Sequence, residues 1–209
     1  PVQSGYYYLA DNISLEEQWT IAEGVEIVLD LNGKTIESAK RAIGMNKASS
    51  LTITDSVGGG AILAKTEVKD NGMVINVNNA QAILNLYAGT LDGSGVTNGN
   101  NGAAINVSGS MYMYGGTVIG ATAVSGANGG AVRISNENAK LELLGGTIHG
   151  GRADRGGAVF NNGTVQMSGG DITGGNADNG GAIYNAGTLN MSGGTITGGT
   201  VSGQGSAIY

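Results

Sequence analysis

Residues 180–204, GGAIYNAGTLNMSGGTITGGTVSGQ, repeat the block just before them, GGAVFNNGTVQMSGGDITGGNADN at 156–179. Leu189 and Val165 occupy the same place in the two copies. Earlier copies place Leu141, Met111, Leu84, Leu51 and Leu29 there, at intervals that vary with the lengths of the loops. A period of roughly 20 to 50 residues is typical of solenoids, propellers and repeat arrays. The repeat therefore decides the fold class.

The composition excludes several other classes of protein. The 209 residues include 40 Gly but only 1 Pro, which does not fit the proline-rich triple helix of collagen. Apolar residues make up 40% of the chain and recur at fixed places, which argues against disorder. We interpret the glycines as residues that form the corners of a repetitive fold.

The charge and the cysteine content exclude several kinds of binding partner and metal site. A formal charge of −6 provides no basic surface for nucleic acid. The absence of Cys excludes disulfides and thiolate metal sites. No apolar run reaches the roughly 18 residues that a membrane helix needs, so direct membrane insertion is not expected.

Each copy begins with two apolar residues that flank a polar one, as in Leu84-Asn85-Leu86. This alternation predicts a half-buried strand with the apolar pair pointing inward. The predicted inward pairs are Leu29/Leu31, Leu51/Ile53, Leu84/Leu86, Met111/Met113, Leu141/Leu143, Val165/Met167 and Leu189/Met191. The residues between them, predicted to point outward, are Asp30, Thr52, Asn85, Tyr112, Glu142, Gln166 and Asn190.

Two further short strands are predicted in each copy. The second is centred, after a glycine corner, on Ile36, Ile62, Leu91, Val118, Ile148, Ile172 and Ile196. The third begins at Ile43, Ile75, Ile105, Val132, Val159, Ile183 and Ile208. The place two residues further on is apolar in the early copies, so we expect Asn161 and Asn185 to lie inside, with their amides hydrogen-bonded along the axis. Phe160, Tyr184 and Tyr209 are then expected to point outward.

Three short strands per copy predict an all-β, single-stranded, right-handed parallel β-helix of about seven coils over residues 25–209. Residues 1–24 do not fit the repeat and are predicted to form an N-terminal cap. Within the cap, Ser14 and Glu17 have the spacing of a capping box, so residues 14–18 are interpreted as a short helix or an edge strand. GSAIY at 205–209 repeats the start of a copy, and we expect the β-helix to be truncated within its last coil.

The copies differ mainly in the loops 119–130, 149–157 and 173–181, which we expect to form an irregular polar ridge. Asp154 and Asp178 hold matching places in these loops, near Asp171 and His149, and are the best candidates for paired catalytic carboxylates. With Asn176 and Asn179 they could also bind calcium, although we favour a solvated turn. No cofactor or metal is predicted.

The aromatic residues of the third strand have two interpretations. Phe160, Tyr184 and Tyr209 could form an exposed row on which sugars stack. We favour the other interpretation, in which the rings pack against one another across successive coils. Threonines at the start of the second strands resemble an ice-binding array only superficially, because Asp171 interrupts them.

The chain resembles the repetitive surface proteins of Gram-positive gut bacteria. The resemblance is carried by GYYYLADNISL, VEIVLDLNGKTI and SLTITDS, followed by the GGAIYNAGTLNMSGGTITGG copies. The resemblance implies a pectate-lyase-like right-handed parallel β-helix that is secreted or attached to the cell wall. It implies no catalytic residues. A weaker similarity links GGAVFNN at 156–162 to chlamydial polymorphic outer-membrane proteins, but Gly163 stands where their FxxN signature has Asn.

We therefore expect a non-catalytic extracellular segment of a bacterial surface protein, either an adhesin or a glycan-binding stalk. Its expected partners are a host or dietary glycan, or a host surface protein, and its uncapped end predicts end-to-end self-association. The candidate ligand-binding residues are Phe160, Tyr184, Tyr209, Asp154 and Asp178. A carbohydrate-active enzyme, a polysaccharide lyase or glycoside hydrolase, is the alternative, and a purely structural spacer is a third possibility.

Overall fold

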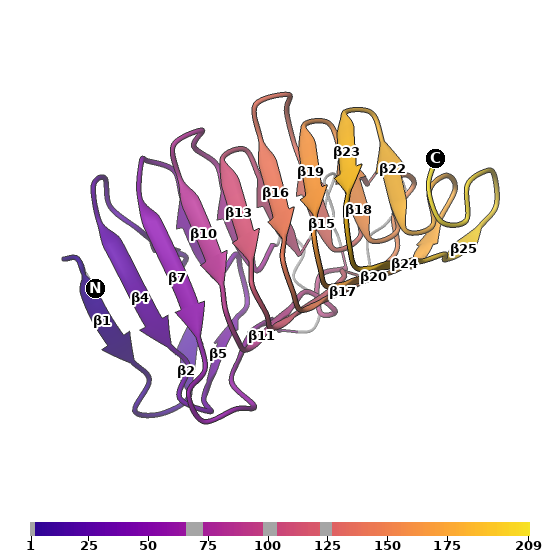
Figure 1. Ribbon diagram of the computed structural model, residues 1–209. Coiled ribbons are helices and arrows are strands. Elements are labelled where there is room, and N and C mark those ends of the chain that lie inside the picture. Colours follow the sequence, from indigo (N-terminus) through magenta and orange to yellow (C-terminus); the bar gives the residue numbers. More distant parts are fainter. Residues whose placement is uncertain (1–2, 66–72, 98–103, 122–126) are drawn as a thin grey trace.

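The computed structural model describes residues 3–65, 73–97, 104–121 and 127–209. In these ranges the protein is all-β, and the chain winds as a right-handed parallel β-solenoid of about seven turns with three strands per coil. Figure 1 shows the coils side by side, from the indigo N-terminal end to the yellow C-terminal end. No helix in the described part of the chain is long and apolar enough to cross a membrane. The predicted fold class is confirmed.

Three parallel sheets form the sides of the solenoid. Sheet A contains β1 (Gly5–Tyr8), β4 (Glu26–Asp30), β7 (Ser50–Thr54), β10 (Ile83–Leu86), β13 (Ser110–Met113), β16 (Lys140–Leu143), β19 (Thr164–Met167) and β23 (Thr188–Met191). Sheet B contains β2 (Ile13–Leu15), β5 (Thr35–Ser38), β8 (Ala61–Ala64), β11 (Thr90–Asp92), β14 (Thr117–Ile119), β17 (Thr147–His149), β20 (Asp171–Thr173) and β24 (Thr195–Thr197). Sheet C contains β3 (Trp19–Thr20), β6 (Ile43–Met45), β9 (Ile75–Val77), β12 (Ile105–Val107), β15 (Val132–Ile134), β18 (Val159–Asn161) and β22 (Ile183–Asn185).

Equivalent aliphatic residues pair directly across successive coils. In sheet A, the backbone register aligns Leu84, Met111, Leu141, Val165 and Leu189 in one column, as predicted. In sheet B, Ile62 pairs with Ile36 and Leu91 despite the longer link before it, which confirms its predicted place. Because each column is covered by the coil on either side, almost all of these side chains are buried.

The predicted column is wrong at β4, in the second coil of the solenoid. Leu51 pairs with Ile27 and Ile53 pairs with Leu29, so the inward pair of β4 is Ile27/Leu29 and not Leu29/Leu31. The segment IVLDL alternates over three apolar residues, so its pattern fits either register. The strand ends at Asp30, and the turn at Asn32 and Gly33, both with positive φ, follows it. Val28 therefore takes the outward place, and Asp30 lies at the corner, where it is only 3% exposed.

The buried amide of Asn161 confirms the prediction for this residue of the third strand, whereas Asn185 is only partly buried. Asn161 is fully buried, and its Nδ2 donates to Oδ1 of Asn185 on the next coil at 2.7 Å. The same nitrogen also donates to the carbonyl of Thr188, and the Asn161 Oδ1 accepts from the amide of Gly163. Every polar atom of this side chain thus has a partner, which is the condition for a stable buried amide.

Residues 1–24 do not contain the proposed helix. In the described part of this segment, β1, β2 and β3 supply the first strand of each of the three sheets. β2 pairs with β5, Ile13 with Ile36, so the edge-strand interpretation is correct and the helix interpretation of residues 14–18 is wrong. The capping-box spacing of Ser14 and Glu17 is overridden because strand pairing with the next coil satisfies the backbone groups.

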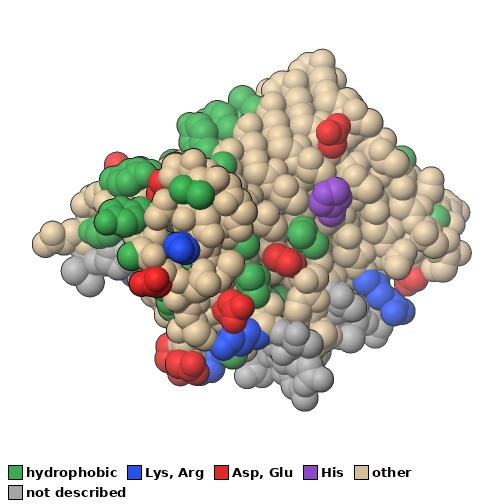
Figure 2. All heavy atoms as spheres, turned by 90° about the horizontal axis from the view of Figure 1, so that it is seen from below, with side chains coloured by type: hydrophobic (Ala, Val, Ile, Leu, Met, Phe, Trp, Pro, Cys, Tyr) green, Lys and Arg blue, Asp and Glu red, His purple; other side chains and the backbone are tan. Residues whose placement is uncertain are grey.

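Sheet B presents an open outer face. Figure 2, which shows the molecule from below, has isolated acidic side chains and one histidine on a surface that is otherwise mostly uncharged. Asp171 pairs with Thr147 in this sheet, and His149 pairs with Thr173. These two candidates from the sequence therefore belong to the outer face of sheet B.

Candidate functional site

The loops between the second and third strands form an ordered stack in the C-terminal coils. β21 (Asn176–Ala177) pairs in parallel with β25 (Thr200–Val201), and Arg152 forms a bridge to Asn176. The irregular ridge expected from the sequence is therefore wrong for these loops, which continue the register of the coils. Loop 119–130 includes residues 122–126, which lie outside the described residues.

A hydrogen bond between two glycines closes the base of loops 149–157 and 173–181. The amide of Gly151 donates to the carbonyl of Gly157 at 2.7 Å, and Gly175 donates to Gly181 in the same way at 2.8 Å. These bases stack directly on one another, so that a Cβ atom at Gly175 would collide with the carbonyl oxygen of Gly151. The double glycines in GGRADRGG and GGNADNGG are therefore required for the loops to stack.

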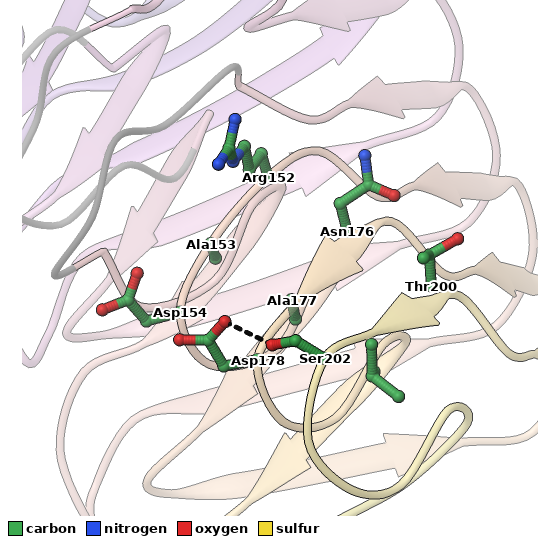
Figure 3. A pocket seen from close by; sticks show the side chains of 9 residues that line it. Arg152, Ala153, Asp154, Asn176, Ala177, Asp178, Thr200 and Ser202 are labelled. Atoms are coloured by element: carbon green, nitrogen blue, oxygen red, sulfur yellow. Dashed lines mark hydrogen bonds between the residues drawn. The ribbon is translucent and has the colours of Figure 1, made fainter.

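The stacked loops surround a hollow of about 420 Å³, which we call the loop hollow. Its lining consists of residues at matching places in three successive loops. One row is Arg152, Asn176 and Thr200, the second is Asp154, Asp178 and Ser202, and between them in the chain lie Ala153, Ala177 and Val201. Figure 3 shows the two polar rows as sticks, with the alanines between them.

Asp154 and Asp178 lie on neighbouring loops of this hollow. The amide of Asp178 donates to the carbonyl of Asp154 at 3.0 Å, which fixes the two residues in register. Backbones of neighbouring strands are about 4.8 Å apart, so the two carboxylates face the same space. The hydroxyl of Ser202 donates to Oδ1 of Asp178 at 2.7 Å and adds the third loop to the cluster (Figure 3).

The structure leaves one of the proposed calcium ligands, Asn179, outside the loop hollow. Asn179 uses its Oδ1 to accept from the amide of Gln204 at 3.0 Å, and it does not line the loop hollow. Among the described residues, no group of three or more His, Cys, Asp or Glu side chains is placed to hold a metal ion. His149 and Asp171 do not line the hollow either.

The aromatic residues of sheet C form a stack across the coils. The ring centroids of Phe160 and Tyr184 are 5.5 Å apart, and those of Tyr184 and Tyr209 are 5.2 Å apart. The guanidinium of Arg155 lies 5.4 Å from the centre of the Tyr184 ring. The ring faces are thus largely occupied by one another, which agrees with packing across the coils.

The sugar-stacking interpretation requires that all three rings of the row be exposed, and they are not. Phe160 is only 9% exposed, whereas Tyr209 is 48% exposed. The alternative interpretation, in which Phe160 belongs to an exposed row, is therefore wrong, and Tyr209 is the most accessible ring of the three.

A second aromatic pair is not predicted from the sequence. Tyr87 and Tyr114, each directly after a strand of sheet A, stack with centroids 4.4 Å apart and are 50% and 41% exposed. Burial among neighbouring groups, and then Tyr87, raise the pKa of Tyr114. Their common place, directly after the inward pair of successive copies, is the available signal in the sequence.

The loop hollow also contains Arg152, Asn176, Thr200 and Ser202. Of these four residues, only Asn176 is a candidate from the sequence. The signal for the others is their offset from the double glycines, since each hollow-lining triplet directly follows GG. Aligning the loops on these glycines finds all three rows.

Comparisons with family models, curated proteins and solved structures found no match for this chain. The fold and the loop hollow therefore rest on the repeats and on the geometry described above.

Proposed function

We propose that this chain is a non-catalytic, extracellular segment of a bacterial cell-surface protein that binds glycans in the loop hollow. The observation on which the proposal rests is the loop hollow itself, which is lined by polar side chains of three successive loops. The resemblance to pectate-lyase-like surface proteins of Gram-positive gut bacteria supports the extracellular, wall-associated setting.

The chemistry of the hollow suits a sugar. Hydroxyl groups of a sugar both donate and accept hydrogen bonds, and they need both kinds of partner. Asp154 and Asp178 supply acceptors, Arg152 supplies donors, and Asn176 supplies both. A volume of about 420 Å³ is within the usual range for ligand sites.

The solenoid supports a stalk-like role. Each coil is hydrogen-bonded to the next in three sheets, so the loop hollow stands on a continuous and rigid stack. A rod of this kind can hold a binding surface at a distance from the cell wall. The same geometry would serve a purely structural spacer, which would bind nothing in the hollow.

A carbohydrate-active enzyme is the second candidate. Asp154 and Asp178 lie on neighbouring loops, and retaining glycosidases hold their two carboxyl groups about 5–5.5 Å apart. A polysaccharide lyase or glycoside hydrolase would cleave the polysaccharide, whereas a binding protein would leave it intact.

A glycan array tests the proposal. We expect the wild-type protein to retain one class of glycan and the Asp154→Ala/Asp178→Ala variant to lose it. The control variant Glu137→Ala/Asp171→Ala removes the same charge from exposed places outside the hollow and should bind normally. Mass spectrometry of the retained glycan should show it intact, whereas shortened products would establish the enzyme instead. Absence of all glycan binding would contradict the proposal.

A further inference from the structure

Several asparagines of the chain are followed directly by glycine. In the described part of the chain these are Asn32, Asn128, Asn162 and Asn179. Asn is among the thermolabile residues of proteins, and a following Gly has no side chain to shield its backbone nitrogen from the Asn amide. Three more pairs, which begin at Asn71, Asn98 and Asn101, lie outside the described residues. The described pairs thus share their chemistry and differ in their surroundings.

In three of these pairs, a neighbouring coil holds the glycine nitrogen. The acceptors are Oδ1 of Asp55 for the Gly33 amide at 2.7 Å, the carbonyl of Arg155 for Gly129 at 2.8 Å, and the carbonyl of Gln204 for Gly180 at 3.0 Å. An amide that donates such a hydrogen bond becomes reactive only when the local structure opens. Freeing any of these three nitrogens therefore requires two coils to part.

Two of the asparagine side chains are held across coils as well. Nδ2 of Asn32 donates to the carbonyl of Leu9 at 2.9 Å. Oδ1 of Asn179 accepts from the amide of Gln204 at 3.0 Å. These hydrogen bonds keep both side chains from turning toward the glycine nitrogen that follows them.

The pair Asn162–Gly163 has different surroundings. The Asn162 side chain is exposed, whereas the other three asparagines are half-buried. The Gly163 amide donates to Oδ1 of Asn161, which belongs to the same turn, at 3.0 Å. Nδ2 of Asn162 reaches the carbonyl of Ser135 only at 3.4 Å. A rearrangement within this one turn can thus bring the Gly163 nitrogen to the Asn162 side chain.

We propose that Asn162 is a site of spontaneous deamidation and that it reacts before the other described Asn–Gly pairs. The deprotonated nitrogen of Gly163 attacks Cγ of Asn162 and forms a new C–N bond. The bond from Cγ to Nδ2 breaks, and ammonia leaves with the proton that the Gly163 amide lost. Water then opens the resulting succinimide at either of its carbonyl carbons and leaves aspartate or isoaspartate at this position.

The isoaspartate product should disturb the corner between β18 and β19. It adds a carbon atom to the backbone of a turn that has no spare room, because a Cβ atom at Gly163 would already collide with the carbonyl oxygens of Asn136 and Ala139. The melting temperature should therefore fall as the product accumulates. The inference is independent of glycan binding, since Asn162 does not line the loop hollow.

Peptide mapping by mass spectrometry tests the inference on protein kept folded in a mildly alkaline buffer. We expect the amide of Asn162 to be lost at least about tenfold faster than those of Asn32, Asn128 and Asn179. The rate should rise with pH, because the attacking nitrogen must first lose its proton. In denaturant the four sites should react at similar rates, since each is followed by Gly.

Two matched variants locate the effect. Asn162→Gln moves the side-chain amide away from the Gly163 nitrogen, so it should prevent the modification and preserve the melting temperature during storage. Asn128→Gln makes the same change at a pair held by the next coil, and Asn162 should then react as in the wild type.

Three outcomes would overturn the inference. The first is a reaction at Asn162 in the folded protein that is no faster than at the other three sites. The second is an unmodified Asn162 after a time in which the denatured protein reacts completely. The third is an Asn162→Gln variant whose melting temperature falls as quickly as that of the wild type, which would show that the corner is not where ageing acts. None of these results bears on glycan retention, which tests the loop hollow alone.

Discussion

The hydroxyl of Tyr6 donates a 2.7 Å hydrogen bond to Oδ2 of Asp30 and joins the first coil to the second. The Asp30 carboxylate also accepts from the backbone amides of Asn32 and Ser56. Burial alone would raise the pKa of Asp30. The hydrogen bonds, those of Ser56 foremost, outweigh this effect and lower the pKa to about 2. The buried carboxylate is thus stabilised in its charged form.

This corner predicts an acid-sensitive end of the solenoid. Because the pKa of Asp30 is lower in the folded protein than the roughly 3.9 of an unfolded chain, its contribution of about 2 kcal/mol is present above pH 4. It is lost as the pH falls toward 2. Thermal unfolding of wild-type and Asp30→Asn proteins should therefore differ at neutral pH and converge at about pH 2. A constant difference across this range would contradict the assignment.

Replacing the buried amide of sheet C should destabilise the protein. Asn161→Leu keeps the branched shape of the side chain but removes the hydrogen-bond partners of the Gly163 amide and of Oδ1 of Asn185. We expect the free energy of unfolding to fall by roughly 2 kcal/mol or more in chemical denaturation. Asn162→Ala, at the exposed neighbouring residue, should change it by less than about 0.5 kcal/mol. Equal effects of the two substitutions would show that the buried hydrogen bonds are unimportant.

A methyl group at the base of a loop should disturb the hollow. The Cβ atom of Gly175→Ala would collide with the Gly151 carbonyl, so the loops must move apart. We expect a loss of more than about 1 kcal/mol and reduced retention on the glycan array. The control is Gly5→Ala, whose Cβ would meet only the Tyr7 side chain at 3.4 Å. Normal stability and binding of Gly175→Ala would mean that the bases are not in tight contact.

The aromatic stack should affect stability more than binding. Phe160→Ala removes a buried ring from between two coils and should cost about 3 kcal/mol, measured by denaturant unfolding. Tyr209→Ala removes a half-exposed ring and should cost less than about 1 kcal/mol. Glycan retention should be unchanged in both. Loss of retention by a stable Tyr209→Ala variant would instead restore the sugar-stacking interpretation.

The N-terminal end predicts self-association. Among the strands that the structure describes, β1, β2 and β3 each have one unpaired edge, and an apolar hollow of about 430 Å³ lies there, lined in part by Tyr7, Ile13 and Trp19. Unpaired edges of this kind favour addition of further strands. Sedimentation velocity should show larger species as the concentration rises, and Ile13→Lys should suppress them. A single monomeric boundary at all concentrations would show that the ends do not associate.

The aliphatic columns could be predicted from the sequence because every coil repeats the same inward places. Prediction failed at β4, where Ile27, Leu29 and Leu31 alternate without a break and only strand pairing selects the register. The burial of Phe160 could not be predicted either, because the alternation along its strand indicates only that the side chain points outward.

The candidate site was predicted in part. The matching places of Asp154 and Asp178 were visible, because the interval between copies is constant in the last coils. Arg152 and Ser202 were missed because their residue types change from loop to loop while their places stay the same. Conversely, Asn179 was included on residue type alone, although its side chain binds the backbone of the next loop.

The glycine bases separate what is constant in the molecule from what can change. Each loop leaves and rejoins its coil at hydrogen-bonded neighbours such as Gly151 and Gly157, so its residues can be exchanged without altering the winding. Successive loops can then change their residues one at a time while the coils beneath them keep the same hydrogen bonds.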